Sequence, residues 1–300
     1  MRIHALLIGI NDYHPKSNVS SLEGCVNDVH RMESYIKTYY KDLKPKIKIL
    51  TNEEATRNNI IENFNSELAD KVKDNDVAFF YYSGHGSYNL PAKEFKKFDS
   101  RNQDETLVCY DSRLKGKYDL ADKELAVLIS KIQEGAEIIV MVDACHSGSI
   151  TRTLAQRSYK RKFAKNSESD KPRPLKTYLA EDDQYYFKQF KKNGSLKIPM
   201  ARHIALSACG RLEEAIEYPE GSGLFTNQIL ELLNKNQNLS YASLFSVIRN
   251  KVSSEYRAQN PELDPVNGFN PNSIIFRKGT IENHRRYLIK YIETDLKLEL

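Results

Sequence analysis

The sequence predicts an α/β protein with a mostly parallel central sheet and helices on both faces. Short apolar runs typical of buried strands alternate with longer stretches in which apolar residues recur at helical spacing. Two of these runs, 78–82 and 138–142, are β-branched or aromatic and too short to form free-standing helices. Alternation of this kind builds sheets whose parallel strands are joined by crossover helices.

The alternation continues along most of the chain. Strands are expected at 2–10, 46–51, 76–82, 106–110, 137–142, 203–208 and 273–277. Helices are expected near 24–40, 56–73, 120–133, 224–235 and 240–257. Thr56 is a typical N-cap residue for the second helix. The tail from 279 to 300 has the pattern of an amphipathic terminal helix, for which the sequence suggests no function.

Composition limits the classes of protein that fit. A chain of 300 residues suits one large α/β domain or two small ones. The four cysteines show no CxxC spacing, so neither a zinc site nor a disulfide framework is indicated. No apolar run approaches the roughly 20 residues of a membrane span. We therefore expect a cytoplasmic monomer that has no membrane partner, a setting that keeps thiols reduced.

The positive charge is concentrated in one stretch. Residues 151–200 hold 13 Lys and Arg against 5 Asp and Glu, a net +8 in a chain whose total is +5. The part around 152–176 is also rich in Ser and Pro and lacks clear periodicity, so it is predicted to be a linker or mobile loop. We see no motif that reads nucleic acid, so a nucleic-acid partner is not expected.

Two predicted strands end in short reactive peptides. One runs into Ser83-Gly84-His85-Gly86, and the other into Asp143-Ala144-Cys145-His146-Ser147-Gly148. Parallel strands deliver such residues to one carboxyl edge of the sheet, so neighbouring strands would bring His85 and Cys145 together. A thiol needs a base of this kind, because the thiolate is the nucleophile. The pattern therefore predicts a hydrolase with a Cys145/His85 dyad.

The same residues carry a family resemblance. Tyr-Tyr-Ser-Gly-His-Gly at 81–86 and Asp-Ala-Cys-His-Ser-Gly at 143–148 resemble the His and Cys motifs of caspase-like cysteine peptidases, and most resemble metacaspases and their prokaryotic relatives. Further segments follow in the family's order, at 5–13, 22–29, 203–209, 213–215, 223–226 and 259–261. The resemblance implies a caspase-like fold. It also implies a peptidase domain over 1–278, comprising a large-subunit-like part (1–150), the basic loop (151–198) and a small-subunit-like part (199–278).

The resemblance implies an endopeptidase acting on protein or peptide substrates. Cys145 would attack the carbonyl carbon, and His85 would take up the thiol proton and pass it to the leaving amine. The backbone amides of Gly86 and Cys145 would form the oxyanion hole. The alternative is that Cys145 is an inert buried thiol and His85 a core histidine. Their joint placement at two strand ends favours the catalytic interpretation.

The resemblance also implies the S1 pocket, which takes the side chain before the scissile bond. Asp28, Ser83 and Asp143 match its lining, where carboxylates select Arg or Lys. Caspases proper have a basic pocket and cut after aspartate, so these acidic residues predict cleavage after Arg or Lys. On the residues alone, Asp28 could instead stabilise a helix start, and Asp143 could orient the cysteine loop.

The family is cut between its two subunits, which corresponds to the basic loop here. Candidate processing sites there are Arg152, Arg157, Lys160, Arg161, Lys162 and Lys165. Cleavage by the chain itself, or by an activating partner, is one hypothesis. The alternative is a solvated loop that is never cut.

Many metacaspases bind calcium, and Asp104-Glu105 resembles part of their acidic cluster. Calcium takes six to eight oxygen ligands. Few other acids accompany this pair, and the family's aspartate shortly after the Cys motif has no counterpart in Ile150-Thr151-Arg152. We therefore expect no cofactor and calcium independence.

Two rival functions stay open. One is a catalytically silent caspase-like scaffold or regulatory interaction protein. The other is a thiol transpeptidase on the same fold, which would transfer the acyl group to an amine instead of water. A nucleic-acid-binding module is a more distant third.

Overall fold

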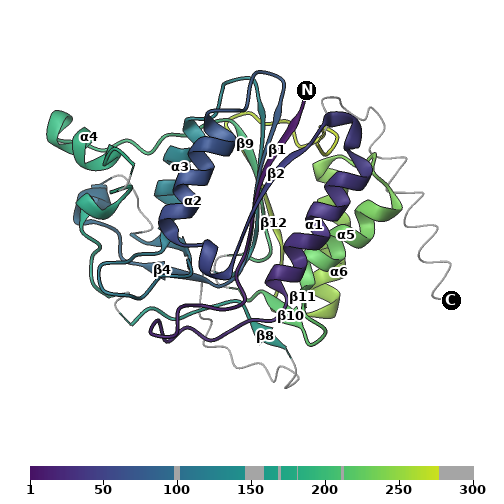
Figure 1. Cartoon of the computed structure of the whole chain (residues 1–300), viewed down its shortest axis with the longest axis horizontal. Helices are drawn as coiled ribbons and strands as arrows, with labels where there is room; N and C mark the ends of the chain where they lie inside the picture. Colours follow the sequence, from purple (N-terminus) through teal and green to yellow (C-terminus); the bar gives the residue numbers. More distant parts are fainter. Residues whose placement is uncertain (98–101, 146–158, 168–169, 181, 211–212, 277–300) are drawn as a thin grey trace.

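We describe a computed structural model that places residues 1–97, 102–145, 159–167, 170–180, 182–210 and 213–276. Its centre is a six-stranded sheet of order β12-β9-β7-β3-β1-β2 (Figure 1). The strands are β1 (Ile3–Gly9), β2 (Lys46–Thr51), β3 (Val77–Ser83), β7 (Glu137–Asp143), β9 (His203–Ser207) and β12 (Glu262–Val266). All neighbours are parallel except β12, which runs antiparallel to β9. The predicted mostly parallel α/β sheet is confirmed.

Helices cover both faces of this sheet, as the sequence predicts. On one face lie α1 (Cys25–Tyr39), α5 (Leu224–Lys235) and α6 (Tyr241–Glu255). On the other lie α2 (Arg57–Asn63), which continues as a π-helical turn over Phe64–Ala69, and α3 (Asp122–Ser130). Helix α2 begins where expected, because the Thr56 hydroxyl accepts a hydrogen bond from the amide of Asn59 at 3.3 Å.

The two central strands contribute side chains to the hydrophobic core on each face of the sheet. Every residue of β3 and β7 is buried. Their side chains alternate, so that Phe80 and Tyr82 pack towards α2 and α3 while Phe79 and Tyr81 pack towards α1 and α5. The register pairs Ser83 with Asp143, so both strands end at the same level.

Two small antiparallel sheets extend from this frame. One consists of β4 (Gly86–Asn89), β5 (Asp104–Leu107) and β6 (Leu120–Ala121). The other consists of β8 (Lys160–Arg161), β10 (Ile216–Tyr218) and β11 (Ser222–Gly223). Among the described residues, no helix is both long and apolar enough to cross a bilayer.

The prediction of a last strand at 273–277 was wrong. Ile274 forms only an isolated bridge with Ser240, while Ile275 and Phe276 are buried in the core outside regular structure. The sixth strand is β12 instead, which is half polar and largely exposed. It contains Pro265, which an edge strand tolerates because no further strand needs its missing N–H. Apolar periodicity marks buried elements, so it misplaced this edge strand.

The prediction that the part around 152–176 is a linker or mobile loop was also wrong where that part is described. It contains β8 and two fully or nearly fully buried cations, Lys162 and Arg173, and the helix α4 (Tyr185–Asn193) follows it. Arg173 donates two hydrogen bonds of 2.9 Å to Glu124 and lies over the Tyr178 ring. Burial alone would raise the pKa of Glu124, but Arg173 and Arg57 lower it to about 2. The tail 279–300 lies outside the described residues.

The ion pairs of Glu124 with Arg173 and Arg57 attach the basic stretch and α2 to α3. Their loss should therefore lower the stability of the fold. Arg173→Ala should lower the free energy of unfolding by about 3 kcal/mol, because it removes a partner from a buried carboxylate. Lys176→Ala, an exposed neighbour, should change it by less than about 0.5 kcal/mol. Urea denaturation of both variants measures the difference. Equal, small losses would show that the stretch is not fastened here.

Candidate active site

His85 follows β3 and is almost fully buried. Its Nε2 lies 2.8 Å from the carbonyl oxygen of Ser20, and its own amide donates to the Tyr13 hydroxyl at 2.8 Å. Because a carbonyl oxygen only accepts, Nε2 must carry the proton. Among the described residues Nδ1 makes no hydrogen bond of good geometry, and the backbone of Lys162 lies close to the ring. Burial, with the Lys162 ammonium nearby, lowers the pKa of His85 to about 4 in spite of the Ser20 hydrogen bond.

Cys145 follows β7 and is fully buried. Its thiol lies against the backbone of Ala215, near enough to the Ala215 carbonyl oxygen for a hydrogen bond at 3.2 Å. Its hydrogen bond with Cys209, together with burial, raises the pKa of the Cys209 thiol. Since Ser83 pairs with Asp143, His85 and Cys145 each lie two residues beyond paired strand ends. The structure therefore brings both to the carboxyl edge of the sheet, as the sequence predicts.

A third backbone group joins them at this edge. The carbonyl oxygen of Lys162 accepts hydrogen bonds from the amide of Gly86 at 2.9 Å and from the amide of Cys145 at 3.1 Å. The amide of Lys162 in turn donates to Ala215 at 2.9 Å. The peptide around Lys162 thus lies stretched between β10 on one side and the dyad on the other.

The Lys162 side chain fills a fully buried pocket formed by Asp28, Ser83 and Asp143. Its Nζ lies 3.1 Å from an Asp143 carboxylate oxygen, 2.9 Å from the Ser83 hydroxyl and 3.4 Å from Asp28. Burial would lower the pKa of Lys162, but the carboxylates of Asp143 and Asp28 hold it above its ordinary value. The structure thereby brings together the three residues predicted to line S1.

The walls of this pocket orient its carboxylates. Asp143 accepts from the amide and hydroxyl of Thr226 at 3.2 and 2.6 Å. Asp28 accepts from the amide of Gly223 at 3.0 Å and from the Ser83 hydroxyl at 3.0 Å. Burial raises the pKa of Asp28 to about 6, opposed by the Lys162 ammonium. The Asp28 side chain thus points into the pocket, and α1 has no side-chain cap at its start.

The chain is similar to known proteins over most of its length. The model of the caspase domain matches residues 2–268. The chain belongs to the caspase-domain family. Metacaspase-7 of Arabidopsis thaliana is 35% identical over 154 residues, which is 50% of this chain and 36% of that protein. Metacaspase-1 of Candida glabrata is 26% identical over 290 residues, 87% of this chain and 72% of that protein.

The chain matches part of the length of its sequence relatives and superposes on a solved structure. The chain spans between about a third and two fifths of the length of the first metacaspases that it matches. A crystal structure of a Geobacter sulfurreducens protein superposes with a TM-score of 0.66 at 22% identity, covering 93% of this chain and 98% of that one. This likeness shows a shared fold, and the match to the caspase domain makes it a caspase-like fold. The sequence relatives establish a caspase-family peptidase domain.

The acids considered for calcium in this caspase domain do not form an ion site. Asp104 is fully buried; one of its oxygens lies 2.6 Å from the Lys123 ammonium, and the other accepts a hydrogen bond from the Tyr178 hydroxyl. Within the described residues, no three His, Cys, Asp or Glu side chains are grouped to hold a metal. With an ammonium and a phenol on its carboxylate, Asp104 does not fit calcium. Calcium independence stays a prediction.

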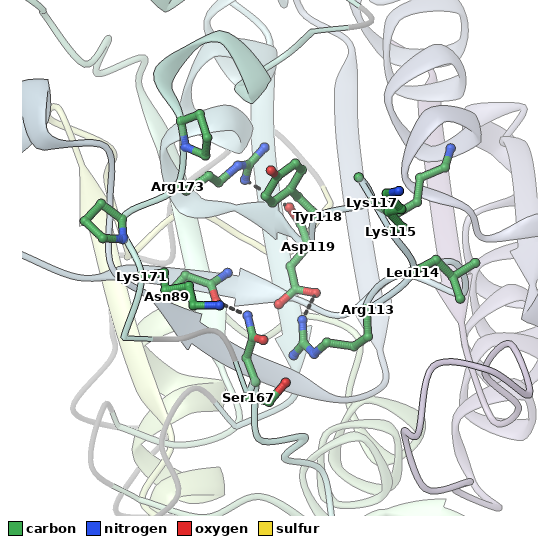
Figure 2. A pocket seen from close by; sticks show the side chains of 14 residues that line it. Asn89, Arg113, Leu114, Lys115, Lys117, Tyr118, Asp119, Ser167, Lys171 and Arg173 are labelled. Atoms are coloured by element: carbon green, nitrogen blue, oxygen red, sulfur yellow. Dashed lines mark hydrogen bonds and ion pairs between the residues drawn. The ribbon is translucent and has the colours of Figure 1, made fainter.

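A hollow of about 580 Å³ is lined by side chains from the loop 113–119 and from residues that follow Lys162 in the chain, among them Ser167 and Lys171 (Figure 2). Its lining includes Asn89, Arg113, Lys115, Lys117, Lys171 and Arg173. The Arg113 guanidinium pairs with Asp119 at its wall, and Asn89 bonds Asn166. This basic hollow is distinct from the acidic pocket that holds Lys162.

Other predicted positions fall into two groups. Lys160 and Arg161 form β8, and Lys165 is exposed beyond the buried Ala164. Arg152 and Arg157 lie outside the described residues. Sequence reasoning missed the parts of the site that come from distant loops, such as Ser20 behind the imidazole and Glu217 of β10 against the loop before α1. Nothing local in the sequence distinguishes these residues.

Gly223 provides a test of how the pocket holds Lys162. A Cβ there would lie 2.1 Å from Asp143 Oδ2 and 2.5 Å from Lys162 Nζ. In a Cys145→Ala background, Gly223→Ala should expel the ammonium. An amine-acylating reagent, read by peptide mass spectrometry, should then modify Lys162 at least about tenfold faster than before, because the opened state becomes the main one.

Lys165, which is exposed, is the internal reference and should react equally in both chains. Gly210→Ala is the matched variant, since the atoms nearest to its Cβ would be those of the Glu262 and Glu213 carboxylates. Unchanged protection of Lys162 in Gly223→Ala would contradict this description of the pocket.

Proposed function

We propose that the chain is a cysteine endopeptidase that hydrolyses peptide bonds after Arg or Lys through Cys145 and His85. One observation carries the proposal. Lys162 is held as a substrate residue would be, with its ammonium between Asp28 and Asp143 and its carbonyl oxygen on the amides of Gly86 and Cys145. An unrelated loop contact would have no reason to satisfy both halves of a peptidase site at once.

In the proposed reaction, Cys145 transfers its thiol proton to Nδ1 of His85 and attacks the carbonyl carbon. The Ser20 carbonyl oxygen supports this role, because it fixes the proton of the neutral ring on Nε2. His85 then protonates the departing amine, which leaves a thioester on Cys145. Water, deprotonated by His85, hydrolyses the thioester and restores the thiol.

The negative charge of the tetrahedral intermediate would develop on the carbonyl oxygen that already receives the two amides. Each such donor is worth about 3 kcal/mol in transition-state stabilisation. The Gly86 amide is fixed at the start of β4, and the Cys145 amide lies two residues beyond the end of β7. The oxyanion hole therefore needs no rearrangement during the reaction.

The selectivity follows from charge. A Lys or Arg side chain neutralises buried carboxylates that would otherwise lie unpaired, whereas an aspartate would add like charge. Because Gly223 has no side chain, there is space for an extended ammonium chain between Asp28 and Asp143. Cleavage after aspartate is therefore disfavoured.

Of the candidate processing sites, Lys162 is the one that the geometry favours. The chain continues beyond it along the far side of the dyad, where Ala164 donates to the Gly86 carbonyl at 3.0 Å and Phe163 stacks on Tyr88. We propose that the bond between Lys162 and Phe163 is cut first and that the chain is latent until then.

Peptide hydrolysis tests the reaction. After incubation to allow processing, the chain should cleave fluorogenic peptides ending in Arg or Lys at least about a hundredfold faster than those ending in Asp, as expected for a buried charge contact. Cys145→Ala should be inactive. Turnover of Asp peptides would overturn the pocket assignment, and no turnover of any peptide would favour the silent scaffold. Ligation to an added amine would favour a transpeptidase.

Intact mass tests the processing. The wild-type chain should divide into two fragments, the second beginning at Phe163, while Cys145→Ala stays whole. Lys162→Ala should abolish this cut, because it removes the side chain from the acidic pocket, and Lys165→Ala should leave it unchanged. Cleavage that persists in Lys162→Ala at another basic residue would contradict the assignment.

A further inference from the structure

We propose that the cleft recognises three consecutive basic residues, so that the substrates are exposed protein segments with Lys or Arg at the scissile position and at the two positions before it. This inference rests on the proposed function and extends it to two further subsites. It is drawn from how Lys160, Arg161 and Lys162 are each matched by a different set of carboxylates.

The backbone of this tripeptide is held as an added strand. Arg161 pairs with Ile216 and Lys160 with Glu217, antiparallel along β10. Recognition by strand addition uses backbone hydrogen bonds for affinity and alternate side chains for selectivity. Because successive side chains of a strand point to opposite faces, Lys160 and Lys162 meet one wall of the cleft and Arg161 meets the other.

The second position, occupied by Arg161, faces Glu214. The guanidinium and carboxylate lie 3.0 Å apart, and the Glu214 side chain is only 5% exposed. The other Glu214 oxygen accepts a hydrogen bond from the Tyr256 hydroxyl at 2.8 Å, which fixes the carboxylate towards the cleft. A buried, oriented carboxylate is a strong acceptor for a cation and is costly to leave unpaired.

The third position, occupied by Lys160, faces Glu23. The ammonium lies 2.7 Å from the Glu23 carboxylate. Glu217 positions the Glu23 loop, since its two oxygens accept from the amides of Glu23 at 2.8 Å and Gly24 at 2.9 Å. Both side chains of the Lys160–Glu23 pair are partly exposed, so this subsite should select less strongly than the second.

The concentration of acids here is not a property of the chain as a whole. The protein carries a net charge of +5, yet the residues 160–162 are bordered by Asp28, Asp143, Glu214, Glu217 and Glu23. An acidic groove on a basic chain is what selection of a basic segment requires.

Four peptides separate the subsites: Lys-Arg-Lys-Phe-Ala, Lys-Ala-Lys-Phe-Ala, Ala-Arg-Lys-Phe-Ala and Ala-Ala-Lys-Phe-Ala. Their cleavage before Phe is followed by mass spectrometry with the processed wild-type chain. Arg at the second position should raise kcat/KM about tenfold, because its partner is a buried carboxylate. Lys at the third position should raise kcat/KM about threefold, as for an exposed ion pair.

The variants assign these gains to residues. Glu214→Gln should remove only the gain from Arg, and Glu23→Gln only the gain from Lys. Glu214→Lys should reverse the selectivity at the second position and favour Lys-Glu-Lys-Phe-Ala, a result that general damage to the fold would not produce. Glu220→Gln, an exposed acid at the nearby turn after β10, is the matched control and should leave every ratio unchanged.

The outcomes distinguish the two proposals. Equal kcat/KM for all four peptides would overturn the tribasic inference and leave cleavage after Lys intact. Failure to cleave any of them would overturn the proposed function and the inference together. Gains that survive Glu214→Gln and Glu23→Gln would also overturn the assignment of these subsites.

Discussion

The buried contact of the Lys162 ammonium with Asp28 and Asp143 is the interaction on which the rest of the site depends. Removing three charges from water is expensive, and the cost is offset only when geometry and additional hydrogen bonds are good. Here Ser83, Gly223 and Thr226 supply those hydrogen bonds to the carboxylates. Without a cation the pocket would hold two close carboxylates, which costs several kcal/mol. The pocket therefore favours occupation, by its own chain or by another.

This dependence explains why the site is assembled from elements far apart in the sequence. Asp28 comes from α1, Asp143 from the end of β7, and the Thr226 donor from the first turn of α5. The central sheet brings these elements together at its carboxyl edge, where the register of β3 and β7 places His85 and Cys145 at one level. A shift of one residue between these strands would turn the paired groups to opposite faces.

Much of the fold could be predicted from the sequence, because its central strands are fully buried and its helices are amphipathic. β3 and β7 are buried throughout and apolar except at their end residues, and α5 spans the residues expected of it. β12 could not be predicted, since an exposed edge strand containing Pro265 lacks the apolar alternation that marks a strand. The apolar residues Ile275 and Phe276 are buried without being a strand, so burial alone misled the prediction.

The motifs of the site could be predicted from the sequence, but the residue that occupies its S1 pocket, Lys162, could not. His85, Cys145 and the acidic pocket follow from strand ends and family resemblance, whereas Lys160, Arg161, Lys162 and Lys165 look alike as local sequence. The pairing of Lys160 and Arg161 with β10 joins segments more than 50 residues apart, and Lys162 differs from these neighbours by its buried contacts with Asp28 and Asp143. Glu23 and Glu214 likewise resemble ordinary surface acids until β10 places them beside the cleft.

The same contacts limit how tightly the cleft can hold a basic segment. A segment of the chain itself competes at an effective concentration that free peptides rarely reach, so it should dominate before it is cut. After a cut beyond Lys162, its new carboxylate would face the amides of Gly86 and Cys145, while Lys160 and Arg161 would still be held by Glu23 and Glu214.

Turnover then requires β8 to leave β10. Only two register pairs join these strands, and the Lys160–Glu23 pair is partly exposed to solvent. Release would therefore begin at Lys160, the weakest of the three contacts, and the Arg161–Glu214 pair and the buried pocket around Lys162 would open after it.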